Sequence, residues 1–257
     1  MPEIALEHVT KSYGTILALD NVSLRVKAGE AVGLVGESGS GKSTVASILA
    51  GLLRPDSGQC LFAGQDLTRL DKHAFRVYRR EVQMVFQDFS SALNPCMSAG
   101  ASVAEPLRNF ERLERRDLDQ RIETLLQQVG LSPTVAGHYP RSLSGGEQQR
   151  ICIARALAAE PRFLLLDEVT SNLDVSIQAG ILNLLADLRV SRGLGFLLIS
   201  HDIALVRYLC DRVLVMHQGR IVEELLAENL TRTQHPYTQQ LLASVPSVTH
   251  RNARRLS

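Results

Sequence analysis

The feature that most constrains the fold is a glycine-rich loop between an apolar run and a helical pattern. Residues 36–44 read GESGSGKST and fit the pattern G-x-x-x-x-G-K-[ST]. The apolar residues 31–35 before the loop predict a buried strand, and residues 42–52 after it predict a helix. This order of strand, loop and helix is typical of a phosphate-binding loop in an α/β sheet.

Each residue type in this loop suits a polyphosphate. Glycines allow the backbone to curl so that successive N–H groups point inward, and the positive end of the helix attracts the same anion. We expect Lys42 to contact the β- and γ-phosphates and the Ser43 hydroxyl to bind Mg²⁺. The alternative is a Gly/Ser turn that precedes a helix by chance. The candidate nucleotide-binding residues are Gly36, Ser38, Gly39, Ser40, Gly41, Lys42, Ser43 and Thr44.

Acidic residues and a histidine follow two other apolar runs. Residues 163–166 are apolar and lead into Asp167 and Glu168, and residues 197–200 lead into His201. Strands of a parallel sheet end at one edge, so Asp167 is placed to hold Mg²⁺ and Glu168 to polarise an attacking water. Taken alone, an apolar strand that ends in acids is more often structural, and a lone histidine is usually a partly buried polar residue.

Strand-like and helical segments alternate over most of the 257 residues, which predicts a mostly parallel α/β sheet. Residues from about 88 to 160 are mostly helical and are interpreted as an inserted subdomain. After about residue 224 we expect two short helices and a basic tail, 249–257. Strands are expected at 4–7, 22–26, 31–35, 60–62, 82–86, 163–166 and 195–199, and helices at 42–52, 71–80 and 175–189.

Composition excludes several functional classes. The 28 basic and 27 acidic side chains leave a net charge of +1, which gives no electrostatic footprint for nucleic acid. No apolar run approaches the ~20 residues of a membrane span, and the N-terminus does not resemble a signal peptide. The four cysteines lack metal-ligand spacing, so we expect reduced, mostly buried thiols in the cytosol: Cys60, Cys96, Cys152 and Cys210.

Residues 143–150 read LSGGEQQR. On the residues alone, Ser144, Gly145 and Gly146 begin a helix, and its free N–H groups offer a second site for an anion. The alternative is an ordinary N-capped helix start. The whole string resembles the signature motif of ATP-binding-cassette (ABC) ATPases. The resemblance covers about residues 1–225, with every motif in order.

The resemblance implies roles for further residues. Tyr13 resembles the aromatic residue that stacks on adenine, although a lone tyrosine after a strand is also ordinary packing. Gln87 resembles the glutamine of the Q-loop, which senses Mg²⁺ and the attacking water, and His201 resembles the switch histidine. Residues 171–174, which end in Asp174, resemble the D-loop at the dimer interface. Val169 stands where the family usually has proline, so we expect a slightly looser D-loop and little loss of chemistry.

These roles form one site. The resemblance implies that ATP and Mg²⁺ bind the phosphate loop, and that Ser144, Gly145 and Gly146 of a second subunit close over the nucleotide. The expected catalytic residues are Glu168, His201 and Gln87. The expected magnesium ligands are Ser43, Gln87 and Asp167.

The resemblance also implies the architecture. It predicts a P-loop NTPase (RecA-like) core with a mostly parallel sheet, an antiparallel β subdomain and an inserted α-helical subdomain. The whole chain, 1–257, is expected to be a single ABC nucleotide-binding domain. Residues 1–87 and 160–225 are assigned to the ATPase core, 88–159 to the helical subdomain, and 226–257 to C-terminal helices and a tail.

Partners and cargo follow from the resemblance as well. The chain is expected to pair as a homodimer or as a heterodimer with a paralogous ATPase. That pair would dock on two membrane permease subunits at the cytoplasmic face of the inner membrane. Residues 87–95 and 235–242 resemble importers of oligopeptides, dipeptides and nickel, which act with an extracytoplasmic solute-binding protein. From the residues alone, neither stretch has a mechanism.

Three alternatives remain in view. A soluble ABC ATPase that acts on a non-membrane partner usually has two cassettes, a long coiled coil or a zinc insertion, and this chain has one cassette and no CxxC. A phosphate-loop kinase or GTPase would not explain LSGGEQQR, and no NKxD motif is present. A regulatory cassette without hydrolysis would not need Glu168 and His201.

Overall fold

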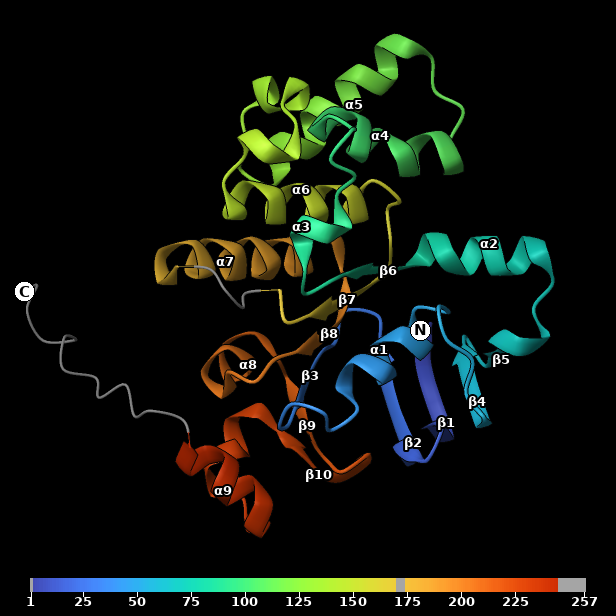
Figure 1. Ribbon diagram of the computed structural model, residues 1–257, viewed down its shortest axis with the longest axis vertical. Coiled ribbons are helices and arrows are strands. Elements are labelled where there is room, and N and C mark those ends of the chain that lie inside the picture. The colour runs from blue at the N-terminus through green and yellow to red at the C-terminus, as the bar shows by residue number, and fades with distance from the viewer. Residues whose placement is uncertain (1, 170–173, 245–257) are drawn as a thin grey trace, which may run out of the picture.

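The computed structural model describes residues 2–169 and 174–244 of the chain. Within these residues the main sheet has six strands (Figure 1). All neighbouring pairs are parallel except β10 and β9, which are antiparallel. From one edge to the other, the strands are β10 (Arg220–Leu226), β9 (Arg212–His217), β3 (Ala31–Val35), β8 (Gly195–Ile199), β7 (Phe163–Asp167) and β6 (Val82–Val85).

The central strands are buried on both faces. Every residue of β3, β7 and β8 is buried. Alternate side chains enter two separate cores, because side chains of a strand alternate between the two faces of the sheet. Leu164 and Leu166 belong to the core that includes the helical region, whereas Phe163 and Leu165 belong to the core with α1 (Lys42–Leu49). This burial explains why the strands are continuous apolar runs in the sequence.

A second sheet packs on α1 and shares a core with it and with the main sheet. It contains β2 (Ile16–Lys27), β1 (Glu3–Tyr13), β4 (Ser57–Phe62) and β5 (Gln65–Asp66), in that order, and all its pairs are antiparallel. Ile4 and Val26 are fully buried in the core that this sheet shares with α1. Short helix η1 (Leu67–Arg69) and helix α2 (Lys72–Glu81) lead from this sheet to β6.

The segment between β6 and β7 is helical and lies above the main sheet in Figure 1. Helix α6 packs against each of the other three α-helices of this segment. The Arg155 guanidinium in α6 donates a hydrogen bond to the Ala92 carbonyl at 2.7 Å. The helices are α3 (Phe89–Ala92), α4 (Ala99–Phe110), α5 (Arg115–Gln128) and α6 (Gly145–Leu157), with short turns η2 (Pro133–Gly137) and η3 (Pro140–Ser142).

The remaining helices follow the core strands. Helices α7 (Val175–Arg192) and α8 (Ile203–Leu209) come after β7 and β8 respectively. After β10, short helix η4 (Ala227–Arg232) buries Leu230 in the core, and α9 (Pro236–Ser244) ends the described part of the chain. Figure 1 shows α9 at the end of the molecule opposite the helical segment.

The predicted fold class is confirmed: an α/β fold with a mostly parallel sheet, an antiparallel sheet and an inserted helical segment. Two expected strands, 4–7 and 22–26, are much longer in the structure, and strands β9 and β10 were not predicted. Helix 42–52 was predicted too long, since it ends at Leu49 and Gly51 adopts φ 67°. Residues 171–173 and the tail 249–257 lie outside the described residues.

The cysteine prediction is confirmed for three thiols. Cys60, Cys152 and Cys210 are buried, whereas Cys96 is exposed. Burial raises the pKa to about 12 for Cys60, about 11 for Cys152 and about 12 for Cys210. Within residues 2–169 and 174–244, no helix combines the length and apolar character that crossing a bilayer requires.

Candidate nucleotide-binding site

The phosphate loop connects the end of β3 to the start of α1, as predicted. Two of its glycines are required by close contacts. A Cβ at Gly36 would lie 2.1 Å from the Met216 carbonyl oxygen, and one at Gly41 would lie 2.5 Å from the Ala18 carbonyl oxygen. Gly41 also adopts φ 107°, which favours glycine. The loop is therefore seated closely against β9 and β2.

Lys42 lies inside this loop with 5% of its surface exposed. Its ammonium donates hydrogen bonds to the Gly36 carbonyl at 2.8 Å, the Glu37 carbonyl at 2.7 Å and the Ser40 hydroxyl at 3.3 Å. Burial lowers the pKa of Lys42, and the nearby carboxylates, above all Glu168, partly oppose that shift. The charge is thus held where an anion bound by the loop would meet it.

Asp167 and Ser43 face each other at the end of β7. The Ser43 hydroxyl donates to Asp167 Oδ1 at 3.4 Å, and Asp167 is 6% exposed. Burial raises the pKa of Asp167, the Ser43 hydrogen bond and the Lys42 charge oppose the rise, and the negative charge of Glu168 adds to it. A hydroxyl and a carboxylate are oxygen ligands that Mg²⁺ prefers, and a dication would offset the cost of burying this charge. The donor set fits magnesium.

The three expected catalytic residues meet at one oxygen atom. Gln87 Nε2 donates to Glu168 Oε2 at 2.9 Å, and His201 Nδ1 lies 3.6 Å from the same oxygen. Glu168 adopts φ 46°, and its N–H donates to the Ile199 carbonyl at 3.0 Å. A left-handed conformation at a non-glycine residue is uncommon. This backbone turn presents the Glu168 carboxylate beyond the end of the strand.

Tyr13 lies at the end of β1 with half of its surface exposed. The Lys11 ammonium is 5.9 Å from the centre of the Tyr13 ring. An exposed aromatic ring next to a cation offers a face on which a flat base can stack.

The signature residues form the start of α6. Ser144 is the N-cap, and its hydroxyl and N–H make reciprocal hydrogen bonds with Glu147, which forms a capping box. A Cβ at Gly146 would lie 2.8 Å from Ile177 Cγ2, so this glycine lets α6 approach α7 closely. Figure 1 shows α6 in the helical segment, apart from α1. Asp174 is exposed at the N-cap of α7.

One supporting contact was not expected from the sequence. The Gly219 N–H, in the turn between β9 and β10, donates to the Ser40 carbonyl at 3.0 Å. The turn residues gave no local sign of this contact, because the pairing of distant strands creates it.

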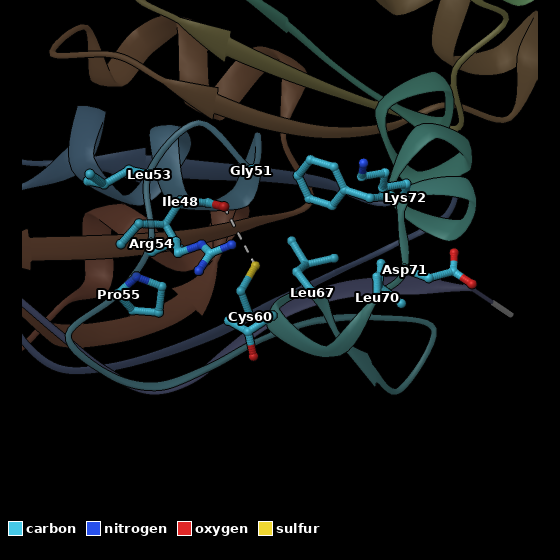
Figure 2. Close-up of a pocket in the computed structure, with 12 residues that line it drawn as sticks. Ile48, Gly51, Leu53, Arg54, Pro55, Cys60, Leu67, Leu70, Asp71 and Lys72 are labelled. Carbon is cyan, nitrogen blue, oxygen red and sulfur yellow. Dashed lines mark hydrogen bonds between the residues drawn. The ribbon is translucent and has the colours of Figure 1, made fainter.

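A separate cavity of about 240 Å³ is lined by residues from the end of α1, from β4 and from the start of α2. Figure 2 shows the Cys60 thiol in this cavity, directed at the Ile48 carbonyl. Leu67 and Leu70 line the wall beside it. The cavity wall includes none of the expected nucleotide-site residues.

Together, the fold and the loop between β3 and α1 are those of a P-loop NTPase. Residues 19–171 match the ABC transporter family. The chain belongs to this family and is an ATP-binding subunit of an ABC transporter, as predicted. The reading as a soluble ABC ATPase for a non-membrane partner is not favoured.

Three relatives illustrate this membership. The chain is 48% identical over 232 residues to "Probable peptide ABC transporter ATP-binding protein y4tS" of Sinorhizobium fredii, covering 90% of this chain and 66% of that protein. It is 44% identical over 234 residues to "Oligopeptide transport ATP-binding protein OppF" of Lactococcus lactis, covering 91% and 73%. It is 47% identical over 235 residues to "Nickel import ATP-binding protein NikE" of Pseudomonas putida, covering 91% and 86%.

Two solved structures of ATP-binding-cassette proteins share this fold. One chain of the dimeric structure of the ATP-binding cassette MJ0796, in a post-hydrolysis state bound to ADP and Pi, superposes with a TM-score of 0.80 at 34% identity, covering 87% of this chain and 98% of that one. CbiO1 of Clostridium perfringens, part of the ABC transporter complex cbiONQ, superposes with a TM-score of 0.79 at 28% identity, covering 89% and 90%. The predicted ATPase activity is thereby supported.

Proposed function

We propose that this chain hydrolyses ATP to drive import of peptides, nickel or a chelated metal through partner membrane subunits. The observation that supports hydrolysis most directly is the meeting of Gln87 and His201 at the Glu168 carboxylate. The printed names of the relatives support the cargo classes.

In this proposal the phosphate loop binds the polyphosphate of ATP through its backbone N–H groups. Lys42 binds the β- and γ-phosphates, in exchange for some of its present bonds to loop carbonyls. Tyr13 stacks on adenine. Ser43, Asp167 and Gln87 hold Mg²⁺, which, when bound, neutralises charge on the phosphates.

Glu168 is the general base that accepts a proton from the attacking water. The Gln87 amide orients its carboxylate through the 2.9 Å hydrogen bond. His201 contacts the γ-phosphate from the end of β8. Each of the three side chains follows a different parallel strand, β7, β6 and β8, so the sheet fixes their relative positions.

The second half of each site comes from a second cassette. Ser144, Gly145 and Gly146 of one copy bind the nucleotide held by the phosphate loop of the other, and Asp174 lies at the interface. The separation of α6 from α1 in Figure 1 supports this arrangement, as does the dimeric state of MJ0796. The second cassette is an identical copy or a paralogue.

The membrane partners are two permease subunits. The helical subdomain, residues 88–159, docks on them, while residues 1–87 and 160–225 form the ATPase core and 226–257 the C-terminal segment. This places the pair on the cytoplasmic face of the inner membrane, as a peripheral protein. An extracytoplasmic solute-binding protein delivers the cargo.

The test is Glu168→Gln. We expect turnover to fall at least ~100-fold, the scale of a lost general base, while magnesium-dependent ATP binding remains. Phosphate release and nucleotide titration on the purified chain measure both quantities. Lys42→Ala, which is expected to lose tight nucleotide binding, is the comparison variant. Normal turnover by Glu168→Gln would mean that the base is another residue.

A further inference from the structure

A tyrosine of the C-terminal helix contacts the phosphate loop. Tyr237, the second residue of α9, is 9% exposed, and its hydroxyl accepts a hydrogen bond from the Glu37 N–H at 3.1 Å. Its ring packs on His217 at the end of β9, with the ring centres 3.9 Å apart and an angle of 36° between the planes. The motif HPYT, residues 235–238, thus has a structural role that the sequence alone did not explain.

This contact acts on the same peptide group that Lys42 holds. The peptide between Gly36 and Glu37 presents its carbonyl to the Lys42 ammonium at 2.8 Å and its N–H to the Tyr237 hydroxyl at 3.1 Å. A peptide group is planar and rigid, so bonds at both of its ends fix its orientation. The next carbonyl, of Glu37, accepts from Lys42 and from the Ser40 N–H at 3.2 Å. A single peptide group thus connects the Tyr237 hydroxyl to the buried Lys42 ammonium.

Helix α9 is in turn fixed to the main sheet. The Glu223 carboxylate of β10 accepts hydrogen bonds from the hydroxyls of Thr233 and Thr238. Thr238 has no exposed surface, and Leu230 before it is fully buried. These contacts hold α9, and therefore Tyr237, in place. A side chain that is already ordered loses less conformational entropy when its hydroxyl forms a hydrogen bond.

We propose that Tyr237 is a positioning residue of the nucleotide site, and that docking of α9 and occupancy of the phosphate loop stabilise each other. The inference rests on nucleotide binding at this loop, as proposed above. If the hydroxyl holds the Gly36–Glu37 peptide in its binding orientation, its loss weakens nucleotide binding without touching the reacting groups. By reciprocity, a bound nucleotide makes α9 harder to detach.

The first test compares Tyr237→Phe with the wild type. Phenylalanine keeps the ring on His217 and removes only the hydroxyl. We expect magnesium-ADP to bind about three- to tenfold more weakly, the usual effect of one lost hydrogen bond, and KM for ATP to rise while kcat changes little. Tyr208→Phe is the matched control: Tyr208 is an exposed residue of α8, and its hydroxyl donates to Asn183 Oδ1 of α7 at 3.0 Å, away from the phosphate loop.

The second test asks whether α9 acts through this hydroxyl. Thr238→Val keeps the buried shape and removes the bond to Glu223, so it should also weaken magnesium-ADP binding. In the double variant with Tyr237→Phe we expect no further weakening, because the connection is already broken. Additive effects would indicate general loosening of the fold and would contradict the proposal. Thermal unfolding without nucleotide checks that each variant is folded.

The third test is reciprocal. Magnesium-ADP should slow hydrogen exchange of the α9 amides in the wild type and in Tyr208→Phe, and should not do so in Tyr237→Phe. Equal affinity of Tyr237→Phe and wild type, or equal protection of α9, would overturn this inference alone. Absence of magnesium-ADP binding by the wild type would instead overturn the proposed function.

Discussion

At the scale of single residues, the site places charges where folding alone would not favour them. Lys42 and Asp167 are both nearly buried, and burial shifts their pKa values in opposite directions, each toward the neutral form. Such groups reduce the stability of the free protein. In the proposed function, a ligand that brings an anion to Lys42 and a cation to Asp167 would offset this cost.

Asp167→Asn is expected to show this cost directly. The folded-state pKa of Asp167 is raised, so its ionisation opposes folding above the pKa of the unfolded chain. Without magnesium, the variant should therefore unfold at a higher temperature than the wild type at pH 7. The difference should shrink as the pH falls toward the unfolded-state pKa of about 3.9 and become small below about pH 3, where the aspartate is mostly protonated in both states. Thermal melts from about pH 2.5 to 8 measure this.

Asp119→Asn, exposed on α5, is the matched control for those melts. A wild type more stable than Asp167→Asn at pH 7 would contradict the stated cause. Asp167→Asn should also lose magnesium-dependent ATPase activity, because it removes a proposed magnesium ligand.

The residues of the phosphate loop could be predicted from sequence because they act through the local backbone. A strand, glycines and a helix start stand together in one short segment, so Lys42 and Ser43 could be found before the distant contacts of the loop were known. The contact of Gln87 with Glu168 joins the ends of two strands. The residues alone did not indicate it, and the family resemblance assigned Gln87 to the site without predicting this contact. The bond between Tyr237 and Glu37 had no sequence signal, since only the packing of α9 on β9 brings them together.

At the scale of elements, the strand predictions failed where the backbone is irregular. The first strand was expected to end at residue 7, but β1 continues to Tyr13. The second was expected to begin at residue 22, but β2 begins at Ile16. The pairing of the two strands is irregular in these added parts. His8 and Asn21 adopt φ 52° and 54°, and His8 Nδ1 lies 2.9 Å from Asn21 Oδ1. Such bulges interrupt the alternation of apolar and polar residues, which is the signal for a strand.

Helix α6 connects the signature residues to the segment that follows Gln87. The Arg155 guanidinium binds the Ala92 carbonyl at the end of α3, and the Cys152 thiol lies 3.8 Å from the Phe89 carbonyl at its start. Two backbone carbonyls of α3 are thus held by side chains of α6.

Arg155→Met is expected to destabilise this junction. It removes a charged donor from the partly buried Ala92 carbonyl while keeping most of the apolar stem, so the free energy of unfolding should fall by about 1–3 kcal/mol. Urea denaturation measures the change. Arg116→Met, exposed on α5, should stay within about 0.5 kcal/mol of the wild type. An Arg155→Met protein as stable as this control would show that the junction is weak.

At the scale of the whole molecule, we propose that one chain holds two halves of different sites. The phosphate loop and the start of α6 both offer backbone N–H groups to an anion, and they belong to different parts of the fold. In the proposed function, a single nucleotide contacts both segments when two copies face each other. ATP hydrolysis then removes the group that both copies share, so the pair should separate after each turnover.

Sedimentation of the Glu168→Gln protein tests this arrangement. With magnesium-ATP we expect the dimer to form, and without nucleotide or with magnesium-ADP the monomer to dominate, because only uncleaved ATP keeps both halves in contact. Ser144→Arg in the same background places a bulky side chain at the exposed N-cap of α6. It should prevent the dimer while each monomer still binds ATP through its own loop. A Ser144→Arg protein that dimerises as well as its parent would mean that the α6 start lies outside the interface.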